Sequence, residues 1–278
     1  MIILSWLFFT LTYALSVFAA RSATVPQMLF FRNIVSLLIV LPWMIYHGPE
    51  SFKTSRFGLL LARSLASLAS LGFMFIAIQK TSLADATLLI NSSPLFVPFV
   101  VAIWLKKSIN HRLWPVLIIG FFGIGLILRP NIKIFDSGAL FALAAGITTA
   151  ISIVAIRLTT TTEKIHTVLF YLFLISAVAA LPLTFFYWES LNTKTVLELI
   201  LMGILAAIAQ ALFVKACHFA TASQLAPFSY SAVLFAGLID FFVWGKVPDW
   251  IACLGIFLVC FAGILIIWLT QPKKLSTN

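Results

Sequence analysis

Ten apolar stretches of about 20 residues follow one another along almost the whole chain. A helix of about 20 residues is long enough to cross the roughly 30 Å hydrocarbon core of a bilayer. The predicted spans are 2–20, 27–46, 57–78, 83–104, 113–128, 137–158, 167–188, 196–216, 223–244 and 250–270. The sequence therefore predicts an all-α membrane protein with ten transmembrane helices.

The composition excludes a soluble domain. Of the 278 residues, 62% are hydrophobic and 9% are charged, whereas about a quarter of the residues in soluble domains are charged. The lipid bilayer is thus the predicted surrounding. The Lys and Arg residues occur singly or in pairs and form no basic patch, so no nucleic-acid partner is predicted.

The distribution of the 18 Lys and Arg residues predicts the orientation. With a cytoplasmic N-terminus, ten lie on the inner side, six on the outer side and two within spans. Because cytoplasmic loops collect Lys and Arg, both termini are predicted to be cytoplasmic, with residues 272–278 as a cytoplasmic tail. The compact loops favour the cell inner (plasma) membrane. The first stretch lacks the basic start of a signal peptide and is interpreted as a span.

An internal repeat becomes visible when the sequence is shifted by 140 residues against itself. The shift aligns 57–104 with 197–244, and it pairs Thr81 with Thr221 and Trp104 with Trp244. Residues 1–130 and 135–271 are the two predicted five-helix repeats. Because five is an odd number, the second repeat must be inverted relative to the first, an arrangement that lets a transporter expose one site alternately to either side.

Two segments carry a resemblance to a known family. Residues 78–104 (IQKTSLADATLLINSSPLFVPFVVAIW) and 215–249 (KACHFATASQLAPFSYSAVLFAGLIDFFVWGKVPD) resemble the two EamA-type halves of drug/metabolite transporters. The resemblance covers essentially the whole chain. It implies a ten-helix permease of inverted repeats with a central cavity, for a small-molecule substrate such as an amino acid or a nucleotide-like compound. Residues 215–230 also resemble bacterial S-adenosylmethionine carriers, which implies exchange of that compound.

Polar side chains near the bilayer midplane are the candidate substrate ligands, because polar groups that face lipid cost several kcal/mol. The main candidates are Asn91, Ser92 and Ser93 on the fourth predicted helix. Pro94 follows directly and removes a backbone donor, which leaves a carbonyl free for a substrate. The alternative is a polar kink that only packs against its neighbours.

The shift of 140 residues pairs Ser231 with Asn91 and places Tyr230 beside it. The Tyr230 ring is therefore predicted to stack on a substrate, the alternative being a polar partner within the bundle. Ser70 and Gln210 form another pair of repeat equivalents near midspan, and Thr148 lies at a similar depth. These three side chains either contact the substrate or join helices by hydrogen bonds.

Two arginines fall inside predicted spans. Arg63 lies about 9 Å into the third helix, where it either reaches the cytoplasmic surface, forms a structural pair or lines the cavity. In the last case the substrate carries a carboxylate or phosphate. Arg32 is interpreted as structural. Asp85, Glu198 and Asp240 lie close to helix ends, so no proton-coupling acid is predicted.

No enzyme motif accompanies the spans. The sequence contains no P-loop, no H-E-x-x-H and no G-x-S-x-G, and its three cysteines lie in apolar stretches without metal-ligand spacing. No catalytic residue, cofactor or metal is therefore predicted, and a secondary transporter is favoured. A structural or assembly membrane protein is the alternative. The sequence leaves the substrate, the direction of transport, the coupling and the oligomeric state open.

Overall fold

The computed structural model describes residues 1–106, 108–109, 111–128, 137–159, 162–219, 226–245 and 250–270. Within these residues all regular structure is helical. The elements are α1 (Ile2–Ala19), α2 (Val25–Tyr46), η1 (Pro49–Phe52), α3 (Phe57–Ile78), α4 (Leu83–Ile90), α5 (Ser93–Leu105), η2 (His111–Leu113), α6 (Trp114–Leu128), α7 (Ser137–Thr159), α8 (Ile165–Phe186), α9 (Thr193–Phe219), η3 (Ala226–Tyr230), α11 (Ser231–Trp244) and α12 (Trp250–Thr270). Thr221 and the predicted tail 272–278 lie outside the described residues.

Seven helical segments of the described chain are long and apolar enough to cross a membrane, with α4 and α5 counted together. Three further apolar helical segments are shorter: His111–Ile124, Phe228–Trp244 and Cys253–Ile266. Each of these segments overlaps one of the predicted spans. The outer surface carries large exposed apolar side chains such as Phe185 and Phe186, as expected for a face that contacts lipid. The chain is therefore an all-helical, multi-pass membrane protein.

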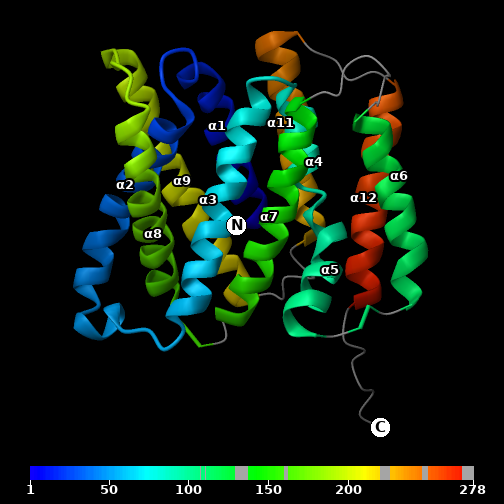
Figure 1. Cartoon of the computed structure of the whole chain (residues 1–278), viewed down its shortest axis with the longest axis horizontal. Helices are drawn as coiled ribbons and strands as arrows, with labels where there is room; N and C mark the ends of the chain where they lie inside the picture. The colour runs from blue at the N-terminus through cyan, green and yellow to red at the C-terminus, as the bar shows by residue number, and fades with distance from the viewer. Residues whose placement is uncertain are drawn as a thin grey trace.

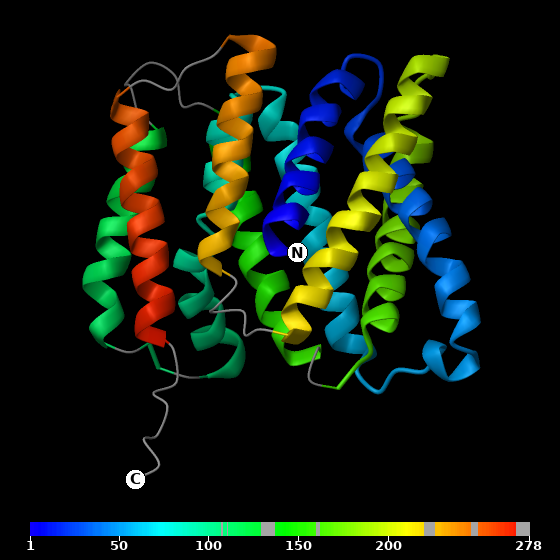
Figure 2. The same cartoon turned by 180° about the vertical axis from the view of Figure 1, so that it is seen from behind.

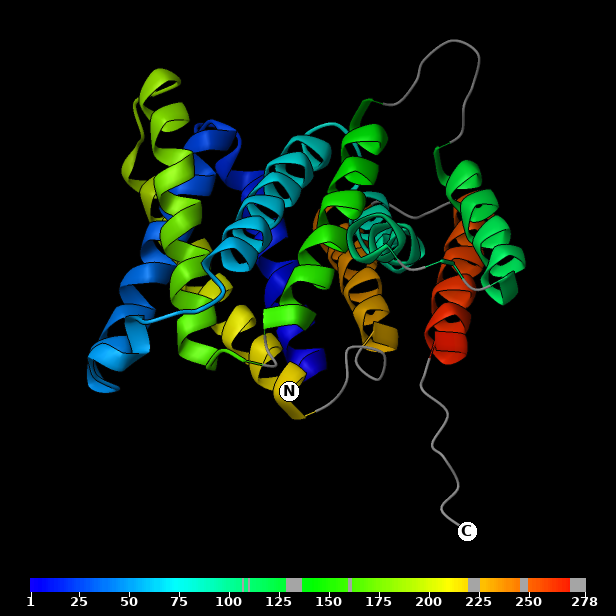
Figure 3. The same cartoon turned by 60° about the horizontal axis from the view of Figure 1, so that its bottom comes forward.

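The helices form a single bundle that is wider than it is tall (Figure 1). Helices α2 and α8 lie at one edge, and α6 and α12 lie at the opposite edge, as the reverse view also shows (Figure 2). Between the two edges, α3 packs on α7 and α1 packs on α9. Seen from the lower side, α5 lies between these central helices and the α6–α12 edge (Figure 3). The centre of the bundle is thus built from both halves of the sequence.

The helix bounds repeat along the chain with the offset found in the sequence. Helix α8 begins and ends 140 residues after α2, at both of its ends. The packing follows the same offset, because the α3–α7 contact has its equivalent in α9–α1. Likewise, the contact of α4 with α7 has its equivalent in the contact of α11 with α1.

The fourth predicted span is not one helix, and the structure corrects this expectation. Helix α4 ends at Ile90 and α5 begins at Ser93, so the span is interrupted at Asn91 and Ser92. Pro94 has no backbone N–H to continue the ladder. The two interrupting side chains bond to the preceding turn instead: Asn91 Nδ2 donates to the Thr87 carbonyl at 2.7 Å, and Ser92 Oγ donates to the Leu89 carbonyl at 2.6 Å.

Helix α7 packs directly against this interruption through a stripe of small residues. Ala142, Gly146 and Ala150 are buried on one face of α7, as close packing of the stripe requires. A Cβ at Gly146 would lie 2.7 Å from the Leu89 carbonyl oxygen, so only glycine allows this approach. The interrupted helix is therefore held against α7 by backbone contact.

Candidate functional site

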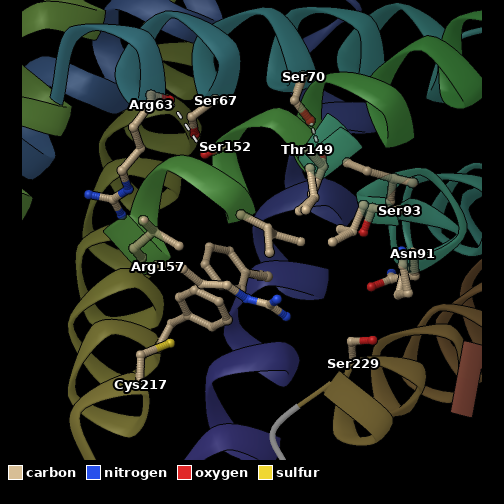
Figure 4. A pocket seen from close by; sticks show the side chains of 18 of the residues that line it. Arg63, Ser67, Ser70, Asn91, Ser93, Thr149, Ser152, Arg157, Cys217 and Ser229 are labelled. Carbon is tan, nitrogen blue, oxygen red and sulfur yellow. Dashed lines mark hydrogen bonds between the residues drawn. The ribbon is translucent and has the colours of Figure 1, made fainter. Parts of the chain in front are cut away.

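A cavity of about 440 Å³ lies at the centre of the bundle (Figure 4). It is lined by side chains from α1, α2, α3, α4, α5, α7, α9 and η3, together with a few residues of the loop after α5 and of α12. The volume falls within the range of small-molecule sites. The polar lining residues are Arg32, Arg63, Ser67, Ser70, Asn91, Ser93, Ser108, Thr149, Ser152, Arg157, Gln210, Cys217 and Ser229, with Tyr13 and Trp6 as polar aromatics.

Five of the predicted site residues line this cavity: Arg63, Ser70, Asn91, Ser93 and Gln210. Ser70 Oγ donates to the Ala145 carbonyl at 3.0 Å and lies 2.6 Å from Thr149 Oγ1, so α3 and α7 are joined at the cavity wall. Figure 4 shows Asn91 and Ser93 on one side of the cavity and Arg63 on the other. The structure thus brings together residues that the sequence assigned to separate helices.

Four of the predicted site residues lie outside the cavity lining: Ser92, Thr148, Tyr230 and Ser231. Thr148 Oγ1 donates to the Ala144 carbonyl of its own helix at 2.9 Å, and Ser231 Oγ donates to the Phe228 carbonyl at 2.6 Å. Backbone carbonyls of the preceding turn therefore satisfy these hydroxyls, as is common for Ser and Thr in helices.

Tyr230 faces α12 instead of the cavity. Its ring is buried, its hydroxyl donates to the Val259 carbonyl at 3.3 Å, and it occupies the space that a side chain at Gly263 would need. The predicted stacking of this ring on a substrate has no basis in this arrangement. The structure supports the other sequence interpretation, a polar partner within the bundle.

Arg63 combines two of the roles that the sequence left open. Its side chain is only 3% exposed, and its Nη1 donates to the Val168 carbonyl of α8 at 3.2 Å. The same side chain lines the cavity, so the guanidinium does not extend to the cytoplasmic surface. Ser152 Oγ donates to the Arg63 carbonyl at 3.4 Å, and this bond joins α7 to the same turn of α3.

Arg32 and Arg157 are lining residues that the sequence did not select as ligands. Arg32 is 2% exposed, and Nη1 donates to the Asn33 side-chain oxygen at 3.3 Å, while Nε has no hydrogen-bond partner. Arg157 lies in the last turn of α7. A signal was present for Arg32, because a cation within a membrane span is expected to face a cavity or a partner.

The aromatic side of the cavity comes from α1 and α9. Trp6, Phe9 and Phe213 line it and pack together, with ring centroids 5.6 to 6.3 Å apart. The Trp6 indole nitrogen is buried without a hydrogen-bond partner, and so is the Gln210 side-chain oxygen. Sequence reasoning missed the aromatic wall because aromatic residues recur throughout the spans, and nothing in the local pattern shows which of them face inward.

Helices α1, α4 and α11 close one end of the bundle. The Asp240 carboxylate of α11 is 3% exposed and accepts a 2.6 Å hydrogen bond from the Ala84 backbone N–H in the first turn of α4. The Phe18 and Trp244 rings stack nearby with centroids 5.6 Å apart. Asp240 is therefore buried between helices, which corrects the sequence interpretation that water or headgroups solvate it.

The fold and the cavity define a multi-pass membrane protein that encloses a small-molecule site between helices of both sequence halves. The sequence model of the EamA-like transporter family matches residues 1–129 and 136–269. The chain belongs to this EamA-like transporter family.

Several similar proteins with assigned names are transporters. An S-adenosylmethionine uptake transporter of Rickettsia bellii is 26% identical over 253 residues, which cover 90% of this chain and 86% of that protein. The pseudopaline exporter CntI of Pseudomonas aeruginosa is 26% identical over 96% of this chain and 94% of its own. The riboflavin transporter of Vibrio cholerae is 26% identical over 96% of this chain and 90% of its own. The protein is thus a membrane transporter.

One solved structure, described only as a protein crystal structure, superposes with a TM-score of 0.67 at 16% sequence identity. The superposition covers 96% of this chain and 95% of the other. At this identity the similarity establishes the fold and carries no information about the substrate.

Proposed function

We propose that the chain is a secondary transporter of the inner membrane that moves a small metabolite by alternating access. The observation that carries the proposal is the polar cavity of about 440 Å³ between helices of both halves. Protein interiors are normally packed with few voids larger than a water molecule. A membrane protein with a purely structural role has no need for a central cavity lined by arginines, hydroxyls and an amide.

The proposed architecture has ten transmembrane helices in two inverted five-helix repeats, residues 1–130 and 135–271. The equal offset of α2 and α8 and the matching packing of α3–α7 and α9–α1 support this division. Both termini and residues 272–278 are cytoplasmic in the proposal, in agreement with the excess of Lys and Arg on that side.

The described conformation is proposed to be open toward the cytoplasm. The lining extends to Val101, Arg157 and Cys217, which lie toward the ends of α5, α7 and α9 that the orientation assigns to the inner side. The opposite end is closed by the Asp240–Ala84 hydrogen bond and the Phe18–Trp244 stack. Exchange between the two repeats of their conformations would open that end and close the first.

The proposed substrate contacts are the predicted residues that line the cavity: Arg63, Ser70, Asn91, Ser93 and Gln210. The proposed cargo is an amino acid or a nucleotide-like compound. S-adenosylmethionine combines both chemistries, and the names of the Rickettsia relatives make it the first compound to test.

The test is counterflow in proteoliposomes. The purified full chain is reconstituted, and uptake of radiolabelled amino acids, S-adenosylmethionine and nucleotides is measured with and without the same unlabelled compound inside. We expect saturable uptake of at least one compound, and we expect preloading to accelerate it. If no compound enters faster than into protein-free vesicles, the proposed transport is contradicted for these substrate classes.

A further inference from the structure

The cavity is rich in positive charge and has no acidic counterpart among its described lining residues. Arg32, Arg63 and Arg157 line it, and no Asp or Glu does. The salt bridge found among the described residues is the surface pair Lys53–Glu50, so these three guanidinium groups are not neutralised by a described carboxylate within 4.0 Å. A buried charge without an opposite charge is costly, and natural proteins normally pair it.

The unpartnered polar atoms in the cavity are mainly hydrogen-bond donors. The Arg32 Nε–H and the Trp6 Nε1–H are buried and have no acceptor among the described residues. Both side chains line the cavity, and Arg32 is one of the largest fully buried side chains of the described chain. Most buried polar groups in proteins are hydrogen-bonded, so two free donors in one cavity indicate a ligand that supplies acceptors.

We propose that the cavity recognises its substrate through an anionic oxygen group, a carboxylate or a phosphate, bound by Arg32. This inference rests on the proposed transport function and names the chemical class of its substrate. The planar guanidinium suits either group, because it donates in parallel to two oxygens. Arg157 and Arg63 lie on the side of Arg32 that leads to the open end, where they attract the anion and lower the barrier to its entry.

The remainder of the substrate then lies against the opposite walls. Trp6, Phe9 and Phe213 offer an apolar aromatic surface, and the unpartnered Gln210 amide offers a neutral polar contact. A substrate with an anionic group at one end and an apolar or ring-bearing part at the other satisfies both sides of the cavity. A neutral sugar or a purely cationic drug leaves the Arg32 donors unmatched.

Matched pairs of compounds test this inference, whichever compound is the natural substrate. Each pair differs by the anionic group alone: AMP and adenosine, S-adenosylmethionine and its decarboxylated form, and succinate and succinamide. The melting midpoint of the purified full chain in detergent is measured with each compound at about 10 mM, enough to detect millimolar affinity. We expect at least one anionic member to raise the midpoint by about 2–4 °C and its partner to have no effect.

The pair that responds distinguishes a phosphate from a carboxylate. In Arg32→Gln, affinity for the responding compound should fall about tenfold to a hundredfold, because a charge-assisted hydrogen bond is lost. Arg56→Gln, at an exposed arginine outside the cavity, should bind as the wild type does. If Arg32→Gln fails to fold, Arg157→Gln replaces it, with slower association expected at low ionic strength.

Two results would overturn the inference. The first is stabilisation by the neutral member of a pair as strong as by its anionic partner, and the second is the absence of stabilisation by all the anions. Transport is a separate question: counterflow of a neutral compound with unchanged affinity in Arg32→Gln would support the proposed function and contradict the anion site. Anion binding without counterflow of any compound would do the reverse.

Discussion

At the scale of single residues, direction decides the role of a polar side chain more than depth does. Ser92 and Ser93 are adjacent and both buried, yet Ser93 lines the cavity and Ser92 bonds to its own helix. Thr149 likewise meets Ser70 at the cavity wall, whereas its neighbour Thr148 bonds to the carbonyl of Ala144. Rotation by one position along a helix therefore separates a candidate ligand from a packing residue.

Replacement of Gln210 by leucine tests a lining amide. Gln210→Leu removes the unpartnered buried oxygen from the cavity, so we expect the KM of counterflow to rise about fivefold with a smaller effect on stability. Thr148→Val is the matched control, because its hydroxyl bonds within its own helix. A KM that rises equally in both variants would contradict the assignment of Gln210 to the cavity.

The sequence identified part of the site for a clear physical reason. A polar side chain at midspan must face the interior, so Ser70, Asn91 and Gln210 could be selected from depth alone. The same reasoning does not reveal which neighbour an interior side chain meets. Depth alone therefore places Tyr230 in the cavity, although the gap left by Gly263 holds its ring against α12.

At the scale of helices, the interruption between α4 and α5 is the main feature that the sequence specified only in outline. The prolines predicted freed carbonyls, and the structure shows a complete break at Asn91 and Ser92. The position of this break depends on α7, since Gly146 admits the Leu89 carbonyl at close range. That contact joins residues far apart in the chain, and local sequence patterns do not encode it.

Substitution of Gly146 by alanine tests this contact. The added Cβ would lie 2.7 Å from the Leu89 carbonyl oxygen, and the resulting strain should destabilise the protein by about 1–3 kcal/mol. Gly237→Ala is the control, because a Cβ there meets nothing within 4 Å and should leave stability unchanged or slightly higher. Thermal unfolding in detergent measures both variants, and equal melting midpoints would contradict close packing at Gly146.

Asp240 provides the second prediction at this scale. Its carboxylate accepts the Ala84 N–H, so Asp240→Leu leaves a buried donor unsatisfied and should cost about 1–3 kcal/mol. Asp240→Asn keeps a side-chain acceptor and should lose less. The same melting experiment ranks the two variants. A leucine variant as stable as the wild type would show that this hydrogen bond does not hold α11 to α4.

At the scale of the whole molecule, apolar length was sufficient to predict an all-helical membrane protein. A span must satisfy its backbone hydrogen bonds internally, so about 20 apolar residues leave few alternatives to a helix. The cavity was not predictable at this level. It forms because both halves contribute helices to the centre of the bundle, and its shape depends on contacts such as α3–α7 and α1–α9.

Cysteine labelling tests the proposed orientation. In a variant with Cys217, Cys253 and Cys260 replaced by alanine, single cysteines are introduced at the exposed Lys53 and Lys194. We expect a membrane-impermeant maleimide to label Lys194→Cys in intact cells and to label Lys53→Cys only after permeabilisation. The reverse pattern would invert the proposed topology.

The central claim is that a substrate passes through the cavity, and obstruction of the cavity tests it most directly. Ser67 lines the cavity on α3, so Ser67→Trp places an indole inside it, whereas Leu201→Trp adds the same ring to an exposed position on α9. Counterflow is measured for equal amounts of folded wild type and of each variant. The account predicts transport by the wild type and by Leu201→Trp, with less than about one tenth of it in Ser67→Trp. Undiminished counterflow in Ser67→Trp would show that the substrate takes another path.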